Sequence, residues 1–263
     1  MTSNQTKIKR IKILTLGDID TGKSCIIKRY CEHRFVSRYM PTIGIDFGVT
    51  KVNIMTLDIK VNIFDSSGNQ VFYGVRNEFY KDTQGILLVF DVCNKTSFDS
   101  LSKWLQELRK HLESEELMER IAVVVCGNKS DLSKRQVDEV DAKIWCEKRN
   151  FSYHETSSKA DENITEAMMD LFTRVVAMVN NCYKPISQPT PHSYTEEELA
   201  LVQRVRHATD NYMMLGLKRN AGKDEVLKAY KSLAILLHPD KNKAPGSEEA
   251  FKLIGQARGN LIT

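Results

Sequence analysis

The sequence predicts a doubly wound α/β domain followed by a small all-helical domain. Over residues 1–180, short apolar runs alternate with amphipathic helical patterns, which is the order of parallel strands connected by helices. A proline-rich segment then changes the composition, and only helical patterns follow it. A chain of 263 residues has room for one domain of ordinary size and a small companion.

Four apolar runs predict strands of the first domain: RIKILTLG (10–17), IKVNIFD (59–65), GILLVFDV (85–92) and RIAVVVCGNK (120–129). The last two are apolar on both faces, as is typical of strands buried in a parallel sheet. Helical patterns lie at 24–31, 97–112, 138–148 and 163–181. The last of these has one apolar stripe, formed by Ile164, Met168, Leu171, Phe172, Val175 and Val179. Ligand-binding loops are then expected at the carboxyl ends of the strands.

The second part of the chain begins with a linker. Residues 184–194 carry three of the six prolines and predict an extended, semi-rigid segment. Thr195 and Glu198 form a capping-box pattern, which predicts a helix to about His207. Further helices are expected at 224–238 and, with Ser247 as N-cap, after the Pro-Gly breaker. The predicted boundaries are therefore 8–183, 184–194 and 195–263.

The stretch GDIDTGKS (17–24) has the G-x-x-x-x-G-K-[ST] outline of a phosphate-binding loop, although its middle contains no glycine. It follows a predicted strand and opens a predicted helix, so backbone N–H groups and the helix dipole can hold phosphate oxygens. Lys23 would reach the outer phosphates and Ser24 would bind Mg²⁺. The nucleotide contacts expected here are Gly17, Asp18, Ile19, Asp20, Thr21, Gly22, Lys23, Ser24 and Cys25.

Two later motifs indicate that the base is guanine. GNKSD (127–131) follows one apolar strand and ETSSK (155–159) follows another. The carboxylate of Asp131 can accept both the ring N–H and the exocyclic amine of guanine, an arrangement that adenine cannot satisfy. The alkyl stem of Lys129 can lie on the base. The sequence therefore predicts binding of GTP or GDP with Mg²⁺.

These motifs, in this order, resemble a Ras-superfamily small GTPase over about residues 8–183. TIGIDF (42–47), DSSG (65–68) and NEFYKDTQGILLVFDV (77–92) resemble the Rab branch in particular. The resemblance implies that Phe35 flanks the base, Tyr39 lies over the phosphates, and Thr42 binds Mg²⁺ and senses the γ-phosphate. It implies that Asp65 holds a metal-bound water and that Gly68 meets the γ-phosphate. The guanine contacts it implies are Asn128, Lys129, Asp131, Ser157, Ser158 and Lys159, and an unknown protein effector would bind the switch regions 35–47 and 65–80.

Three positions depart from that family where hydrolysis is decided. The catalytic Gln of the family is Asn69, its small residue beneath the γ-phosphate is Ile19, and its Ala before Gly68 is Ser67. Asn is one methylene shorter than Gln, and a misplacement of about 1 Å can cost roughly 100-fold in rate. We expect very slow GTP hydrolysis and weak activation by a partner's arginine. Local repositioning of Asn69 would instead leave a conventionally cycling GTPase, so the enzymatic activity stays open at this point.

The C-terminal part resembles a J domain over about residues 209–263. The resemblance rests on DNYMMLGL (210–217), DEVLKAYKSLAILLHPDKN (224–242) and FKLIGQA (251–257), with HPD at 238–240. It implies that His238, Pro239 and Asp240, with Lys228 and Lys231 on the preceding helix, engage a DnaK-type chaperone and stimulate its ATPase. Two alternatives stay open: the two lysines form a merely solvated face, or the J domain is vestigial and the chain is a GTP-bound scaffold.

The two resemblances together indicate the family of Rab-like J-domain proteins (RBJ family). They imply a guanine-nucleotide switch that selects a partner and recruits a DnaK-type chaperone to it. The net charge of +4 is too small to predict nucleic-acid binding. No lipid anchor is predicted, since Cys182 is followed by a linker and a further domain. The six scattered cysteines suggest reduced thiols, and we expect a soluble protein of the cytoplasm, the nucleus or both.

Overall fold

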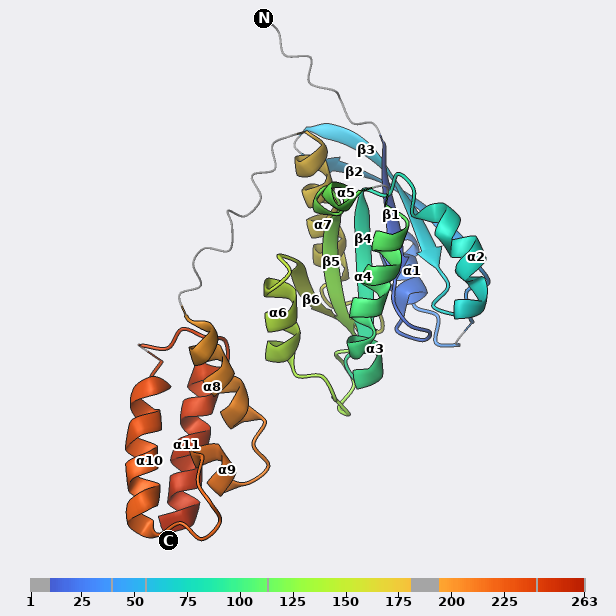
Figure 1. Cartoon of the computed structure of the whole chain (residues 1–263). Helices are drawn as coiled ribbons and strands as arrows, with labels where there is room; N and C mark the ends of the chain where they lie inside the picture. The colour runs from blue at the N-terminus through green and yellow to red at the C-terminus, as the bar shows by residue number, and fades with distance from the viewer. Residues whose placement is uncertain are drawn as a thin grey trace, which may run out of the picture. The chain divides into compact units, whose positions relative to one another are not determined.

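The computed structural model describes residues 10–38, 40–54, 56–112, 114–180, 194–239 and 241–262, apart from the side chain of Glu115. The chain divides into two compact units, Met1–Lys184 and Pro185–Thr263. Figure 1 shows a sheet flanked by helices in the first unit and helices alone in the second. The predicted fold class is therefore confirmed, whereas the predicted linker 184–194 lies outside the described residues except for Tyr194.

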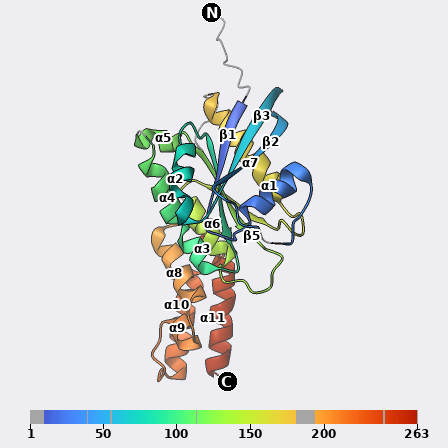
Figure 2. The same cartoon turned by 90° about the vertical axis from the view of Figure 1, so that its right-hand side faces the viewer.

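The first unit contains a six-stranded sheet with the order β2-β3-β1-β4-β5-β6. Strands β1 (Arg10–Leu16), β3 (Leu57–Ser66), β4 (Gly85–Asp91), β5 (Ala122–Asn128) and β6 (Ser152–Thr156) are parallel. The edge strand β2 (Ile45–Ile54) runs antiparallel to β3, and both views show β2, β3 and β1 side by side (Figures 1 and 2). The four predicted strands are confirmed. The antiparallel edge strand was not predicted, because its first residues (45–47) were assigned to a switch region and residues 48–54 were assigned to no element.

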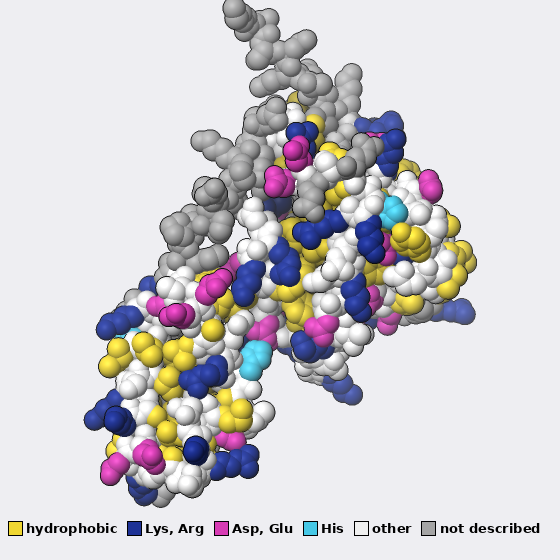
Figure 3. Space-filling model, in the orientation of Figure 1, with side chains coloured by type: hydrophobic (Ala, Val, Ile, Leu, Met, Phe, Trp, Pro, Cys, Tyr) yellow, Lys and Arg dark blue, Asp and Glu magenta, His cyan; other side chains and the backbone are white. Residues whose placement is uncertain are grey.

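Beyond β3 the chain forms a series of short helical turns. These are η1 (Gln70–Phe72), α2 (Tyr73–Arg76) and η2 (Asn77–Phe79). Figure 3 shows hydrophobic side chains gathered on the α2 side of this unit. The most exposed apolar side chains of the two predicted switch regions are Val71, at 81% exposed, and Ile43, at 79%. An apolar surface is therefore present where the resemblance implies effector binding.

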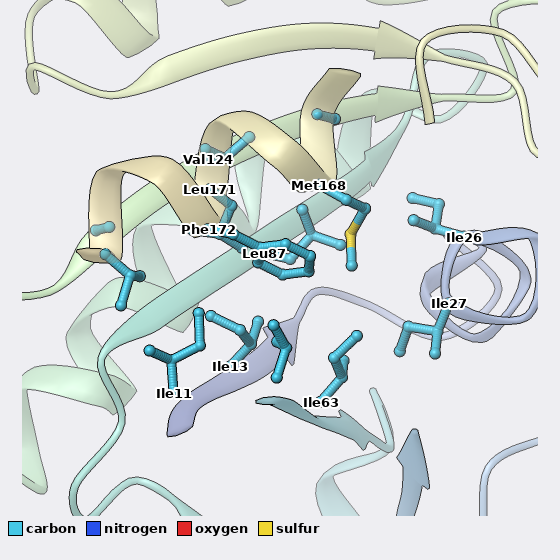
Figure 4. Close-up of a cluster of buried hydrophobic side chains, with 14 of the residues drawn as sticks. Ile11, Ile13, Ile26, Ile27, Ile63, Leu87, Val124, Met168, Leu171 and Phe172 are labelled. Atoms are coloured by element: carbon cyan, nitrogen blue, oxygen red, sulfur yellow. The ribbon is translucent and has the colours of Figure 1, made fainter. Parts of the chain in front are cut away.

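Helices cover both faces of the sheet because each has one apolar stripe. Helices α1 (Lys23–Glu32) and α7 (Ile164–Val179) share one core with β1, β3, β4 and β5, and Figure 4 shows Phe172 and Leu171 of α7 against Ile13 and Leu87. On the other face pack α3 (Lys95–Asp99), α4 (Leu101–Lys110) and α6 (Glu139–Glu147), with α5 (Glu115–Glu119) nearby in the chain. The expected stripe of α7 is wrong at its end. Val179 is 44% exposed and Val176 is buried in its place.

The predicted helix at 97–112 is also divided in two. Asn94 caps α3 by accepting a hydrogen bond from the Ser97 N–H, so the first helix starts before Ser97. The chain then breaks at Ser100, and α4 begins at Leu101. On α4, Trp104 donates from Nε1 to Asp18 of the phosphate loop, and Glu107 accepts from Arg76 of α2.

The described residues of the second unit form four helices: α8 (Glu196–Arg206), α9 (Asn211–Leu215), α10 (Lys223–Leu236) and α11 (Ser247–Ile262). The capping box of Thr195 and Glu198 is present as predicted. Helix α11 packs against each of the other three. Two boundaries differ from expectation: α10 ends at Leu236, before His238, and α11 already includes Ser247. The five-residue helix α9 was not predicted as a separate element.

Candidate nucleotide site and chaperone-contact loop

The loop between β1 and α1 requires glycine at both ends. Gly17 has φ +141° and Gly22 has φ +90°, values that side-chain-bearing residues rarely adopt. A β-carbon at Gly17 would lie 2.1 Å from the carbonyl oxygen of Val89, and one at Gly22 would lie 2.1 Å from Nδ2 of Asn128. Between them Asp20 takes φ 62° without being glycine. The glycine-free middle therefore still forms the tight loop, with Asp at the left-handed position.

Lys23 spans this loop from inside. Its side chain is buried, and Nζ donates to the carbonyl oxygens of Gly17 (2.9 Å) and Asp18 (2.8 Å). Burial lowers the pKa of Lys23 to about 8, while the carboxylates of Asp65 and Asp18 act in the opposite direction. A buried ammonium in such a loop is stabilised by an anion, which is the role predicted for this residue.

The three predicted metal-binding side chains converge on one point. Oγ of Ser24 lies 2.5 Å from Oδ2 of Asp65 and 2.9 Å from Oγ1 of Thr42, and Thr42 donates to the same Asp65 oxygen at 3.3 Å. Asp65 is buried, and this burial raises the pKa of its carboxyl group. Two hydroxyls and one carboxylate are oxygen donors of the kind that Mg²⁺ prefers, so these residues fit the ion.

The predicted guanine contacts also join the loops to one another. Asn128 is buried, donates from Nδ2 to the carbonyl oxygen of Thr21 (2.9 Å), and accepts on Oδ1 from the backbone N–H of Ser158 (3.4 Å). Nζ of Lys129 lies 2.9 Å from Asp91 and 3.4 Å from Asp20. These contacts fix the loop after β5 against the phosphate loop.

The remaining guanine-loop residues lie beside them. Oγ of Ser157 donates to Asp131 at 2.7 Å, so this buried hydroxyl orients the exposed carboxylate that is expected to bind guanine. Lys159 is exposed at the end of the same loop. Sequence reasoning treated all of these side chains as ligand contacts. It missed that Asn128 also connects the loop after β5 to the phosphate loop and that Ser157 also orients Asp131.

A pocket opens beside the phosphate loop. It brings together nine residues that were predicted for the site: Ile19, Asp20, Gly22, Lys23, Ser24, Cys25, Thr42, Gly68 and Asn69. Phe35 and the guanine-loop residues do not line it, and Tyr39 lies outside the described residues. The lining also includes Lys28 and Arg38, which sequence reasoning missed. Their signal was available: Lys28 follows Ser24 by one helical turn, and Arg38 precedes Thr42 by four residues.

The side chain of Asn69 is already engaged. Its Oδ1 accepts a hydrogen bond from the backbone N–H of Val71 (3.0 Å) and so caps η1. Its carbonyl oxygen accepts from Arg76. A β-carbon at the neighbouring Gly68 would lie 2.5 Å from the backbone of Asp18 and Ile19, so the chain at Gly68 touches the phosphate loop.

In the second unit, the predicted chaperone contacts Lys228 and Lys231 lie within α10, and His238 and Pro239 lie in the turn after it. Lys228, Lys231 and His238 are exposed, and the His238 ring packs edge-on against Phe251 at 5.5 Å between centroids. Asp240 lies outside the described residues. Asn242 shapes this turn: its side chain is buried, donates to the carbonyl oxygen of Leu236 (3.0 Å), and accepts from the Ala244 N–H (2.9 Å). Sequence reasoning missed Asn242, whose only signal was its place just after HPD.

Comparisons with known proteins agree with this division. The Ras family model matches residues 12–177, and the DnaJ domain model matches residues 210–262. Two relatives, both called DnaJ homolog subfamily C member 27, match almost throughout. The protein of Danio rerio is 50% identical over 260 residues, covering 97% of this chain and 94% of its own. The protein of Homo sapiens is 50% identical over 254 residues, covering 96% and 93%. Among the described residues, no helix has the length and hydropathy needed to cross a bilayer.

Proposed function

The chain belongs to the Ras family of small GTPases and carries a C-terminal DnaJ domain, and from this we propose that it is a slowly hydrolysing GTP switch that recruits a DnaK-type chaperone. The relatives called DnaJ homolog subfamily C member 27 match both parts of the chain. Membership of the Ras family implies guanine-nucleotide binding, and the J domain suggests an Hsp70-type partner. Within this proposal, residues 8–183 bind the nucleotide, 184–194 link the domains, and 195–263 contact the chaperone.

The convergence of Ser24, Thr42 and Asp65 beside the buried Lys23 carries the nucleotide part of this proposal. When bound, Mg²⁺ would neutralise phosphate charge at the two hydroxyls and the carboxylate. Lys23 and the loop N–H groups would hold the phosphates, and the Asp131 carboxylate would select guanine. Thr42 lies in the first predicted switch region and contacts Ser24 directly. It would therefore couple the binding of Mg²⁺ and phosphate to the conformation of that switch region.

Slow hydrolysis follows from what Asn69 and Ile19 do. The amide oxygen of Asn69 caps η1 by accepting a hydrogen bond from the Val71 N–H. While it makes this hydrogen bond, the oxygen is not available to orient the water that attacks the γ-phosphate. Ile19 is 49% exposed and lines the same pocket, where its β-branched side chain would occupy space that a partner's arginine needs. Both features favour a long-lived GTP state.

Single-turnover GTP hydrolysis tests this directly. We expect the double variant Asn69→Gln with Ile19→Gly to hydrolyse bound GTP at least tenfold faster than the wild-type chain. The longer Gln side chain would reach the attacking water, and removal of the Ile19 side chain would open the pocket beside the γ-phosphate. Equal rates in the two proteins would refute the assignment. The nucleotide content of the purified chain separates the rival reading: GTP supports slow hydrolysis, and GDP supports a conventionally cycling GTPase.

The chaperone part is supported by the exposed His238 at the end of α10 and by the exposed lysines Lys228 and Lys231 one turn apart on that helix. We expect His238→Gln to abolish stimulation of a DnaK-type ATPase by the full chain. Lys228→Ala with Lys231→Ala should weaken it several-fold if the two cations contact the chaperone. Unchanged stimulation in His238→Gln would favour the scaffold with a vestigial J domain.

Selection of a partner is assigned to the switch regions 35–47 and 65–80. Ile43 and Val71 offer exposed apolar surface, and Val75 lies 3.3 Å from where a β-carbon at Gly44 would stand, so the two regions touch. The Ser67 N–H also donates to the Gly44 carbonyl oxygen at 2.8 Å. A protein effector that covers both regions would therefore sense them together.

A further inference from the structure

We propose that Arg38 binds the terminal phosphate of the nucleotide and makes this site prefer GTP over GDP. The inference rests on the proposed guanine-nucleotide site and adds a specificity-determining residue to it. Arg38 belongs to the first predicted switch region but to none of the motifs that identify the site.

The position of Arg38 is the first observation. It lines the pocket together with Thr42, Gly68 and Asn69, the residues expected nearest the third phosphate. Thr42 is fixed to Ser24 by a 2.9 Å contact between their hydroxyl oxygens, which anchors the segment that carries Arg38 only four residues earlier. Arg38 therefore lines the pocket as part of the predicted switch region, and not as part of the phosphate loop.

The charge of the pocket is the second observation. Three cations line it: Lys23, Lys28 and Arg38. The carboxylate of Asp20 also lines the pocket, and Nζ of Lys129 lies 3.4 Å from it. The carboxylate of Asp65 does not line the pocket but lies 2.5 Å from Oγ of Ser24, where it is expected to face Mg²⁺, so the lining side chains themselves carry three positive charges and one negative charge. An excess of positive charge favours the ligand with more negative charge, and the effect is greatest for the cation nearest the added phosphate. This favours the triphosphate.

The availability of Arg38 is the third observation. Within the described part of the chain, its exposed guanidinium has no ion pair or hydrogen bond. Its neighbours differ: Arg34 pairs with Glu32, and Arg29 donates to the carbonyl oxygen of Ser158 at 2.9 Å. A guanidinium presents a planar fork of donors that matches two phosphate oxygens, so Arg38 is suited to bidentate contact.

The test uses the full-length chain with Mg²⁺ and two fluorescent probes, methylanthraniloyl-GDP and methylanthraniloyl-GppNHp. We expect Arg38→Ala to raise the Kd of the triphosphate probe about tenfold and that of the diphosphate probe less than twofold. The Kd of the triphosphate probe for Arg38→Lys should lie between those of the wild type and Arg38→Ala, because lysine keeps the positive charge but lacks the planar pair of donors of a guanidinium. The matched control is Arg34→Ala, an exposed arginine of the same loop that does not line the pocket, and it should leave both constants unchanged.

The outcomes separate this inference from the site on which it rests. If the wild-type chain binds neither probe, the proposed guanine-nucleotide site is wrong. If it binds both and Arg38→Ala changes the two constants equally or not at all, the site stands and the role of Arg38 is wrong. A selective loss of triphosphate affinity in Arg38→Ala, absent in Arg34→Ala, supports the assignment.

Discussion

At the scale of single residues, the buried guanidinium of Arg76 connects the second switch region to the body of the domain. Arg76 is inaccessible to solvent, and its Nε donates to Glu107 of α4 at 2.7 Å. Its Nη1 donates to the carbonyl oxygen of Ser67 at 2.8 Å. Burial alone would raise the pKa of Glu107, but hydrogen bonds from Arg76 and Tyr80 outweigh it and lower that pKa. The pair is thus charged and satisfied inside the protein.

Removing one partner of this pair should be strongly destabilising. We expect Arg76→Met to lower the free energy of unfolding by about 3 kcal/mol, because the mostly buried carboxylate of Glu107 would lose its cation and keep only the hydrogen bond from Tyr80. Arg109→Met, at an exposed position of α4, is the control and should change it by less than about 0.5 kcal/mol. Urea unfolding of the GTPase unit measures both. A loss below about 1 kcal/mol in Arg76→Met would contradict this account.

Asp170 makes a second residue-scale prediction, which depends on pH. Burial alone would raise its pKa, but hydrogen bonds from His154, Ser152 and Arg174 outweigh burial and lower that pKa well below its usual range. A carboxyl group whose pKa is lower in the folded state adds stability above its unfolded pKa of about 3.9 and loses it as the pH falls. We expect Asp170→Asn to destabilise the domain by about 1–3 kcal/mol at pH 7.

The pH profile is what distinguishes this role from simple packing. The difference in unfolding free energy between wild type and Asp170→Asn should shrink as the pH falls from about 5 to 2. Thermal or denaturant unfolding across that range measures it. A difference that stays constant would show that the charge of Asp170 contributes nothing.

At the scale of elements, local patterns were sufficient to predict β1, β3, β4 and β5, the phosphate loop and the loops at the ends of these strands. Each of these depends on residues close in the sequence. The contacts that hold the site together do not: Asn128 bonds to Thr21, 107 positions away, and Trp104 Nε1 donates to Asp18 Oδ1 at 2.7 Å across 86 positions. Pairing with β3 also made an edge strand of residues 45–54, of which only 45–47 had been assigned, as the end of the first predicted switch region.

Helix α8 was predicted from its capping box, and the structure adds that its apolar side chains are buried. The matched DnaJ domain begins at residue 210, after α8, yet Leu199, Val202 and Val205 of this helix are buried. Nε of Arg206 lies 2.7 Å from Glu249 of α11, and the Arg206 side chain is only 5% exposed. The capping box at Thr195 further stabilises the helix. We infer that the folding unit starts near residue 194.

A comparison of two fragments tests this boundary. We expect residues 194–263 to unfold cooperatively and at a clearly higher temperature than residues 209–263, which lack the three buried side chains of α8. Within the longer fragment, Val202→Ala should lower the free energy of unfolding by about 2 kcal/mol through the cavity it leaves. Circular dichroism melting measures both effects. Equal melting temperatures for the two fragments would show that α8 is dispensable.

At the scale of the whole molecule, each of the two compact units has its own hydrophobic core. The core of the first unit lies on both faces of its sheet, and the second unit has its own core around Val226, Leu233 and Ile254. Each compact unit contains the residues of one proposed activity, nucleotide binding in the first and chaperone contact in the second. The proposed coupling therefore acts by recruitment: the switch selects where the J domain is delivered, and the ATP of the chaperone drives the work.

This arrangement predicts two unfolding transitions in the full chain, of which guanine nucleotide shifts only one. A ligand that binds only the folded state stabilises it by RT ln(1 + [L]/Kd), which is about 2.7 kcal/mol at 100 times Kd. With Mg²⁺·GDP at that excess, we expect scanning calorimetry to show a higher midpoint for one transition and an unchanged midpoint for the other. The fragment 194–263, scanned alone, identifies the unchanged transition as that of the helical unit. One joint transition that moves as a whole would mean that the units fold together and that recruitment alone does not describe their coupling.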